Sequence, residues 1–183
     1  MEFELLGSDA VSPTLKLDHE QFAYAGKFVM SSTGKTVARA EGDVVGAVAF
    51  SEDHDDDRTV KLRYVTVREN RRGEGIGPQL LRFTAELLAG GLSESALPDY
   101  DEVVIAANNP MAYRACYRAG FEFTGEETGI AELELRYRPS EQSTERYEAG
   151  LRLYEQRSLP DEQSAALKRF LDEGLPAVVD VPE

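Results

Sequence analysis

The most informative part of the chain is residues 65–78, which read Val65-Thr66-Val67-Arg68-Glu69-Asn70-Arg71-Arg72-Gly73-Glu74-Gly75-Ile76-Gly77-Pro78. An apolar strand runs into a loop with three glycines, and apolar residues then repeat at helical spacing as far as Leu88. Glycines remove side chains where a ligand touches the backbone, and a helix beginning near Pro78 leaves its first N–H groups unpaired. The stretch therefore predicts strand, loop and helix, with an anion-binding site where the loop meets the helix.

The spacing of these glycines narrows the kinds of ligand that suit the loop. A nucleotide P-loop needs Lys and then Ser or Thr after its last glycine, whereas Gly77 is followed by Pro78 and Gln79. A dinucleotide-binding loop has Gly-x-Gly-x-x-Gly, whereas the glycines here occupy every second position. Both nucleotide motifs are disfavoured, and a tight turn without a ligand is the remaining alternative.

A second segment predicts another strand and another helix. Residues 103–107 form an apolar run that is typical of a buried strand. Asn109 is suited to cap a helix, Pro110 to occupy its first turn, and Gly120 to end it in the left-handed conformation. A short helix is therefore expected between Asn109 and Gly120.

Together the two segments resemble the GNAT superfamily of acetyl-CoA-dependent N-acetyltransferases. Residues 72–77 are similar to its Arg/Gln-x-x-Gly-x-Gly/Ala pyrophosphate loop, and residues 109–121 to its Asn-x-x-Ala-x-x-x-Tyr-x-x-x-Gly-Phe helix beside the cofactor. The resemblance spans roughly residues 36 to 138. It implies a mixed α/β fold in which a mostly antiparallel, splayed sheet is flanked by helices.

The resemblance also implies an activity, the transfer of an acetyl group from acetyl-CoA to a primary amine by direct attack on the thioester. The acceptor is expected to be the amine of a small molecule or of a protein. Backbone groups at the end of the strand would pair with the pantetheine arm and direct an N–H at the thioester oxygen. The loop would hold the pyrophosphate, and the helix cap would contact the pantetheine arm. The cofactor-binding residues implied are Val65, Thr66, Val67, Arg72, Gly73, Glu74, Gly75, Ile76, Gly77 and Asn109.

One position departs from the family pattern. Where many relatives carry a tyrosine that protonates the departing thiolate, this chain has Cys116, flanked by Tyr113 and Tyr117. Cys116, with an ordinary pKa of about 8.5, and Tyr113, the tyrosine closer to it around the helix, are the candidate catalytic acids. A small buried core residue is the alternative for the cysteine. No general base is assigned, although Glu69 and the acidic turn around His54 supply candidates.

The charge of the chain is strongly negative. Its net charge of −14 arises from 34 acidic and 20 basic residues, and only five of the basic residues are lysine. The acids are spread along the whole chain, which favours an adaptation to high salt over a specific attraction for cationic substrates, so a halophilic source is expected. Binding of nucleic acid through a broad basic face is disfavoured.

Five arginines stand out against this acidic background as candidates for phosphate contacts, with ordinary ion pairs as the alternative. They are Arg68, Arg71 and Arg72 beside the loop, and Arg114 and Arg118 on the second helix.

Composition also bears on compartment and metal content. The sequence has no apolar run long enough to cross a membrane and no basic leader, so a cytoplasmic protein without a membrane partner is expected. One cysteine excludes an internal disulfide, and with two histidines it offers no standard zinc spacing. We expect acetyl-CoA as cosubstrate and no metal.

The remaining sequence predicts the layout of the chain. Strands are expected at residues 3–6, 36–41, 44–50, 59–67, 121–125 and 130–138, with no assignment between about 7 and 30. Residues 1–138 are expected to form the acetyltransferase domain. Residues 139–183 are expected to form a helical extension that packs on this domain or makes a homodimer contact. The main alternative to an enzyme is a non-catalytic acyl-CoA-binding sensor or assembly subunit.

Overall fold

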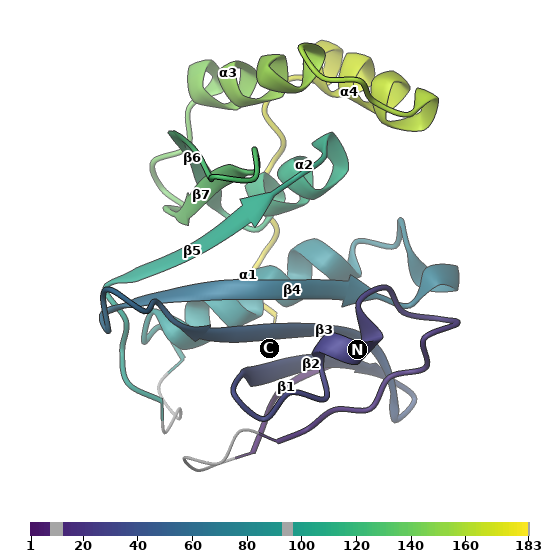
Figure 1. Cartoon of the computed structure of the whole chain (residues 1–183), viewed down its shortest axis with the longest axis vertical. Helices are drawn as coiled ribbons and strands as arrows, with labels where there is room; N and C mark the ends of the chain where they lie inside the picture. Colours follow the sequence, from purple (N-terminus) through teal and green to yellow (C-terminus); the bar gives the residue numbers. More distant parts are fainter. Residues whose placement is uncertain (8–12, 93–96, 183) are drawn as a thin grey trace. The chain divides into compact units, whose positions relative to one another are not determined.

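Figure 1 shows the computed structural model of the chain, which describes residues 1–7, 13–92 and 97–182. The described residues form seven strands, mostly antiparallel, and four α-helices, so the predicted mixed α/β class is confirmed. Two compact units are present: unit 1 comprises residues 1–103 with the residues from 180 onward, and unit 2 comprises residues 104–179. The boundary falls inside strand β5 (Glu102–Ala107). The predicted division after residue 138 stays a prediction.

Unit 1 is built on an antiparallel meander. Its strands are β1 (Glu2–Leu6), β2 (Gly34–Ala40), β3 (Asp43–Glu52) and β4 (Thr59–Val67), and each pairs with its neighbour in the chain. Glu41 and Gly42 both have a positive φ, which matches the twist of a tight hairpin between β2 and β3. The meander predicted for residues 36–67 is confirmed.

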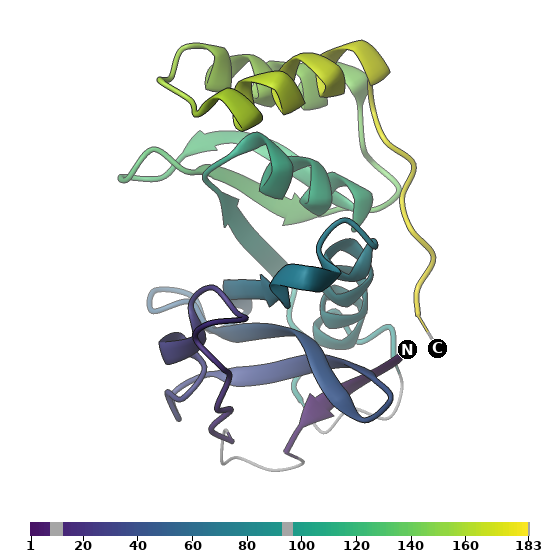
Figure 2. The same ribbon diagram turned by 90° about the vertical axis from the view of Figure 1, so that its right-hand side faces the viewer.

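Helix α1 (Ile76–Leu88) packs on one face of this meander. Its predicted apolar stripe is buried, and Leu80, Leu81 and Leu88 are no more than 2% exposed. The helix approaches the sheet closely at Gly46, where a Cβ atom would lie 3.2 Å from a methyl carbon of Leu80. The hydroxyl oxygens of Thr36 and Thr84 lie 2.6 Å apart in this interface, and Thr84 donates to the carbonyl of Leu80. Figure 2 shows α1 and the strands of unit 1 from the side.

Residues 13–33 cover the opposite face of the meander, where the sequence supported no assignment. Phe22, Ala25 and Phe28 are buried at every third position, in keeping with the short 3-10 helix η1 (Ala25–Lys27). Phe28 packs against Val37 of β2 and two alanines of β3. This segment therefore forms the second layer of the unit 1 core.

Lys35 is a fully buried lysine beneath that segment. Its Nζ donates to the carbonyls of Met30 and Thr33, both at 2.7 Å, and lies 3.0 Å from the Thr33 hydroxyl. These acceptors replace water, and they hold the turn that leads into β2. Burial lowers the pKa of the Lys35 ammonium because it disfavours the charged form.

Unit 2 contains a three-stranded antiparallel arrangement in which the last strand lies between the other two. β7 (Leu133–Tyr137) pairs with β5 and with β6 (Phe121–Glu127). Three helices accompany these strands, α2 (Pro110–Arg118), α3 (Thr144–Glu155) and α4 (Asp161–Glu173). Within the unit, α3 and α4 pack against each other and both pack against α2.

Four fully buried tyrosines join these helices. Tyr113 and Tyr117 of α2 and Tyr147 and Tyr154 of α3 have no exposed surface. The Tyr113 ring lies 5.0 to 5.9 Å, between centroids, from the rings of the other three. Gly150 of α3 makes room for this cluster, because a Cβ atom there would lie 2.1 Å from the Tyr113 hydroxyl oxygen.

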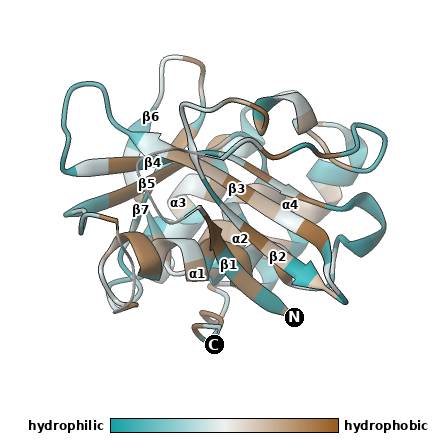
Figure 3. Cartoon of the chain, turned by 90° about the horizontal axis from the view of Figure 1, so that it is seen from below, coloured by the Kyte–Doolittle hydropathy of each residue, from teal (hydrophilic) through white to brown (hydrophobic). Residues whose placement is uncertain are grey.

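The distribution of apolar residues follows these layers. Figure 3 colours stretches of β2, β3 and α1 as hydrophobic, in agreement with their burial. Within the described ranges, none of the helices combines the length and the apolar character needed to cross a bilayer.

Candidate functional site: an uncapped helix start after strand β4

Strand β4 leads directly into the glycine loop. Gly46, Ala47 and Val48 of β3 pair with Val67, Thr66 and Val65, respectively. A short 3-10 turn, η2 (Glu69–Arg71), follows β4 and precedes the three glycines. The predicted strand, loop and helix are therefore confirmed in their order.

Two of the three glycines adopt a backbone conformation that other residues avoid. Gly73 has φ 85° and Gly75 has φ 82°, both left-handed, whereas Gly77 lies inside α1 and has no positive φ. Helix α1 begins at Ile76, two residues before the predicted start near Pro78, and Gly75 is its N-cap. Pro78 still lies in the first turn, where the missing N–H costs no helical hydrogen bond.

The N-terminus of α1 leaves a row of donors without acceptors. Gly75 has no side chain with which to cap the helix, and the first turn contains no acidic residue. Within the described part of the chain, the amides of residues 73–77 have no backbone or side-chain acceptor outside the helix, and the first N–H groups of a helix have none within it. These N–H groups and the positive end of the helix dipole favour an anion such as a phosphate.

The three arginines beside the loop differ in their partners. Arg68 donates from Nε to the side-chain oxygen of Gln21 at 2.5 Å. Arg71 is held by Glu74, with Nε 2.9 and 2.8 Å from its two carboxylate oxygens. Arg72 is exposed, and its only described contact is from Nε to the carbonyl of Val67, at 3.4 Å. Of the three, Arg72 is the guanidinium left free to bind an anion beside the uncapped helix.

Strand β4 is irregular at Arg63, a feature that the sequence did not predict. Tyr64 pairs with Ala49 and Leu62 with Phe50, so Arg63 has no partner residue on β3 and forms a β-bulge. The Arg63 side chain turns to β3, where it donates to the Ser51 hydroxyl at 2.9 Å and to the Glu52 carbonyl at 3.1 Å. A bulge re-aims the residues that follow it, here those that run to the loop.

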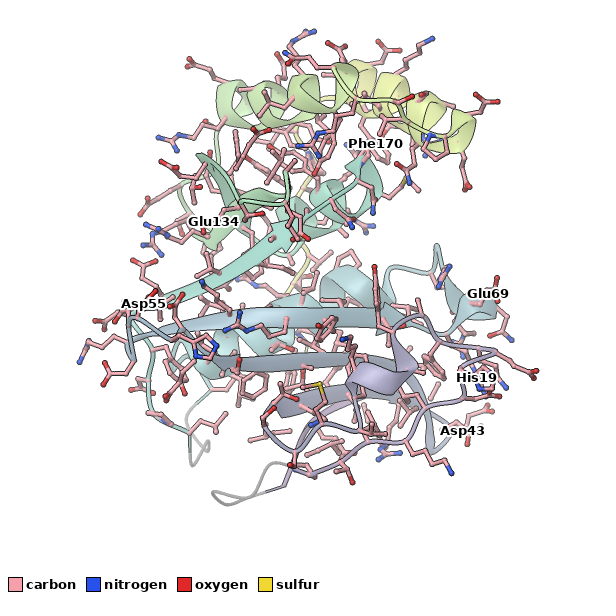
Figure 4. The ribbon with its side chains drawn as sticks, viewed as in Figure 1. His19, Asp43, Asp55, Glu69, Glu134 and Phe170 are labelled. Carbon is pink, nitrogen blue, oxygen red and sulfur yellow. The ribbon has the colours of Figure 1, made fainter. Side chains whose placement is uncertain are left out.

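The candidate bases occupy two ends of unit 1. The acidic turn after β3, which includes His54 and Asp55, precedes β4 and so lies at the opposite end of that strand from the loop. Figure 4 shows Asp55 of the acidic turn at one end of the strands and Glu69 at the other. His54 is exposed, and the structure selects none of these groups as a base.

Asn109 in unit 2 performs the predicted capping role. Its side-chain oxygen accepts from the Ala112 amide at 2.9 Å, and Pro110 occupies the first turn of α2. Its side-chain nitrogen donates to the Asn108 oxygen at 3.0 Å. The predicted contact of Asn109 with the pantetheine arm stays a prediction.

Both candidate acids on α2 are core residues. Tyr113 is fully buried, and its hydroxyl donates to the carbonyls of Arg146 and Tyr147 at 3.2 and 3.1 Å. Burial raises the pKa of this phenol well above its ordinary value. Cys116 is 2% exposed, and burial raises the pKa of its thiol to about 12. These contacts give both side chains a packing role, and their role as acids stays a prediction.

The arginines of α2 also differ. Arg114 donates to the Tyr147 hydroxyl at 2.7 Å, pairs with Glu173 at 2.8 Å and lies over the Phe170 ring. Figure 4 labels Phe170 on α4. Arg114 therefore joins α2 to α3 and α4. These contacts agree with the alternative that this arginine forms ordinary ion pairs and does not bind phosphate. Arg118 makes no side-chain hydrogen bond or ion pair with the described residues.

The described residues contain no group of three or more His, Cys, Asp or Glu side chains placed to hold a metal ion. The predicted site residues fall into two sets. Those from Val65 to Gly77 lie in one continuous segment of unit 1, and Asn109, Tyr113 and Cys116 lie on or just before α2 in unit 2.

Comparison with known proteins agrees with the fold described above. Residues 32–123, just over half of the chain, match the family described as "Acetyltransferase (GNAT) domain". No curated protein matches the sequence. The Bacillus subtilis acetyltransferase in complex with CoA is similar in fold over 74% of this chain and 97% of its own, with 17% identity and a TM-score of 0.52. A GNAT family acetyltransferase from Elizabethkingia anophelis with acetyl-CoA bound has the same identity and coverage, with a TM-score of 0.50.

Proposed function

We propose, on the premise that this chain belongs to the GNAT family of acetyltransferases and is therefore an acyltransferase, that it transfers an acetyl group from acetyl-CoA to a primary amine. The amine would attack the thioester directly, without an acyl-enzyme. The observation that carries the proposal is the uncapped start of α1 with Arg72 beside it. This arrangement is suited to the pyrophosphate of coenzyme A.

The binding part of the mechanism follows from the loop. Backbone N–H groups of Gly73 to Gly77 would donate to the pyrophosphate oxygens, and the absence of side chains at the glycines lets those oxygens approach. The Arg72 guanidinium would add a charge-assisted hydrogen bond. Glu74 takes part only through its backbone, because its carboxylate is occupied by Arg71.

The chemical part would take place along β4. Backbone groups of Val65, Thr66 and Val67 would align the pantetheine arm and supply an N–H to the oxygen that becomes negative in the tetrahedral intermediate. The amine, with an ordinary pKa of about 10, must lose a proton, and the leaving thiolate must gain one. Cys116 and Tyr113 are the candidates for the second step, and water is the alternative proton source.

A sensor that binds acyl-CoA without catalysis is the second candidate function. The burial of both candidate acids favours it, since neither hydroxyl nor thiol is presented at a surface. The backbone features of the loop serve either function equally. Turnover, and not binding, separates the two.

The test is calorimetric titration with acetyl-CoA in molar salt, alongside thiol release against a panel of primary amines. Arg72→Gln is expected to raise the dissociation constant of acetyl-CoA about tenfold, the loss expected for one charge-assisted contact. Arg71→Gln is the matched control and is expected to change it much less, because the Arg71 guanidinium is already paired with Glu74.

The outcomes separate the hypotheses. Tight binding with amine-dependent thiol release supports the transferase. Tight binding without release for any amine of the panel supports the sensor. Absence of acetyl-CoA binding, or equal effects of the two arginine variants, contradicts the assignment of the loop.

A further inference from the structure

Two tyrosines and a lysine gather on the face of the unit 1 meander opposite α1. Tyr24 is 54% exposed although aromatic, and its ring centroid lies 5.9 Å from that of Tyr64 on β4. The Lys27 ammonium lies 5.6 Å from the Tyr64 ring centroid, within the range of a cation–π contact. The three side chains come from η1, its N-cap and β4, and we call them the aromatic–lysine surface.

The backbone at Tyr24 is held in an unusual conformation. Its φ of 60° is left-handed, which is uncommon for an aromatic residue. Such a conformation persists only where the surroundings impose it, and it is a reason to look for function. Here it places the exposed ring beside Tyr64 while the next residue, Ala25, enters the core.

Lys27 is notable for the partner that it lacks. The chain has 34 acidic residues, yet within the described ranges the Lys27 ammonium makes no ion pair with any of them. A cationic acceptor would be repelled at this point, whereas a carboxylate would be attracted. The charge therefore selects against a polyamine and for an acceptor that carries an acid group.

The position of Tyr64 ties this surface to the chemistry proposed above. Tyr64 directly precedes Val65, and successive residues of a strand are only about 3.3 Å apart. Tyr64 also directly follows the bulge at Arg63. A molecule held on the Tyr64 ring thus lies beside the segment of β4 proposed to align the thioester.

We propose that the aromatic–lysine surface binds the acceptor, and that the acceptor is an amino acid with a large apolar or aromatic side chain and a free carboxylate. This proposal rests on the proposed acetyl transfer. Tyr24 and Tyr64 hold the side chain through ring contacts, and Lys27 pairs with the carboxylate. The α-amino group, two bonds from the carboxylate carbon, is then presented to the thioester along β4.

The experiment compares thiol release with L-phenylalanine, with phenethylamine, which lacks the carboxylate, and with L-alanine, which lacks the ring. The value of kcat/KM for L-phenylalanine is expected to be about tenfold higher than for either of the other two compounds. Phenethylamine lacks the charge-assisted contact with Lys27, and L-alanine lacks the ring contacts. Lys27→Gln should remove the preference over phenethylamine, and Lys27→Arg should restore it. Tyr24→Asn, which tolerates the left-handed backbone, should remove the preference over L-alanine. Lys16→Gln, at an exposed lysine of the same segment, is the control.

Acetyl-CoA affinity is measured on every variant and is expected to stay at the wild-type value. If wild-type protein binds acetyl-CoA and acetylates phenethylamine as well as L-phenylalanine, the acceptor proposal is overturned while acetyl transfer stands. If no amine reacts, binding decides the acceptor proposal. It then stands only if L-phenylalanine raises the melting temperature of the CoA-saturated protein, phenethylamine does not, and Lys27→Gln abolishes the increase. Loss of acetyl-CoA binding itself is a failure of the proposed function.

Discussion

One residue type acquires separate roles from its neighbours, as is seen for Arg68, Arg71, Arg72 and Arg114. Three of them are occupied, by Gln21, Glu74 and the Tyr147 and Glu173 pair, and Arg72 alone among these four has only one weak backbone contact. Sequence spacing marks Arg72 through its distance from the glycines. It does not reveal the partners of Arg68 and Arg114, because Gln21 and Glu173 are distant from them in the chain.

The roles of Cys116 and Tyr113 can be separated by conservative variants. Cys116→Ala and Tyr113→Phe are each expected to lower the free energy of unfolding by about 1 kcal/mol, through a small cavity and a lost hydrogen bond respectively. If both residues only pack, kcat for amine acetylation is unchanged once the folded fraction is corrected. A drop of tenfold or more in kcat for either variant, measured on protein that is fully folded at the assay temperature, would identify that side chain as the acid.

At the scale of single elements, local patterns predicted most of what was observed. β4 and the helix after Asn109 lie where alternation and capping residues place them, because both signals are local. The start of α1 differs, since Gly75 can end the loop in a left-handed conformation that lets Ile76 begin the helix. The bulge at Arg63 has no local signal, because it depends on pairing with β3. The apolar residues Phe22, Ala25 and Phe28 recur at every third position of the sequence, which is a local signal of the short helix found there.

Gly150 gives a prediction for helix α3. In an exposed helix, Gly→Ala stabilises by about 1 kcal/mol. Here the added Cβ would lie 2.1 and 2.5 Å from the hydroxyl oxygen and ring carbon of Tyr113, which is fully buried and cannot move aside. Overpacking costs about 1 to 3 kcal/mol or more, so Gly150→Ala is expected to destabilise the protein overall.

Denaturant unfolding of Gly150→Ala and of Arg152→Ala, an exposed position on the same helix, provides the comparison. The arginine variant is expected to stay within about 0.5 kcal/mol of wild type. An increase in stability for Gly150→Ala would show that α3 does not pack on Tyr113 as described.

The whole molecule should lose stability in alkali. Burial raises the pKa of the phenols of Tyr113, Tyr117, Tyr147 and Tyr154, to about 12 for Tyr117. Above pH 10, the ordinary value, the unfolded chain releases these protons while the folded chain retains them. Stability is thus fully present below pH 10 and is lost as pH rises towards the raised values, by about 2 kcal/mol at pH 12 for Tyr117 alone. The contribution of Lys35 to stability changes with pH in the opposite direction. Because burial lowers its pKa, this contribution increases as the pH rises.

Absorbance at 295 nm and far-ultraviolet circular dichroism, followed together from pH 9 to 12.5, test this prediction. The four tyrosines of the cluster are expected to ionise only as the circular dichroism signal is lost. Burial and the hydrogen bond to Glu52 also raise the pKa of Tyr100, to about 12, so its ionisation too is expected well above pH 10. Ionisation of all eight near pH 10 with the folded signal intact would contradict the burial of the cluster.

At the scale of the molecule, the sequence carried less information. It predicted the class and the meander, both of which follow from patterns along neighbouring segments. It did not predict that β7 lies between β5 and β6, or that residues 13–33 cover the face opposite α1. Both depend on contacts between distant parts of the chain, which leave no periodic trace.

The burial of Lys35 bears on self-modification. An acetyltransferase is in constant contact with its acyl donor, and each exposed lysine of the enzyme can compete with the substrate amine as acceptor. This chain has five lysines. The ammonium of Lys35 donates its three N–H groups to the carbonyls of Met30 and Thr33 and to the Thr33 hydroxyl. An acetylated lysine has one N–H and a bulkier end, so the folded chain has no room for that product at Lys35. Acetylation at this position would therefore record that a chain had been unfolded when it met the donor.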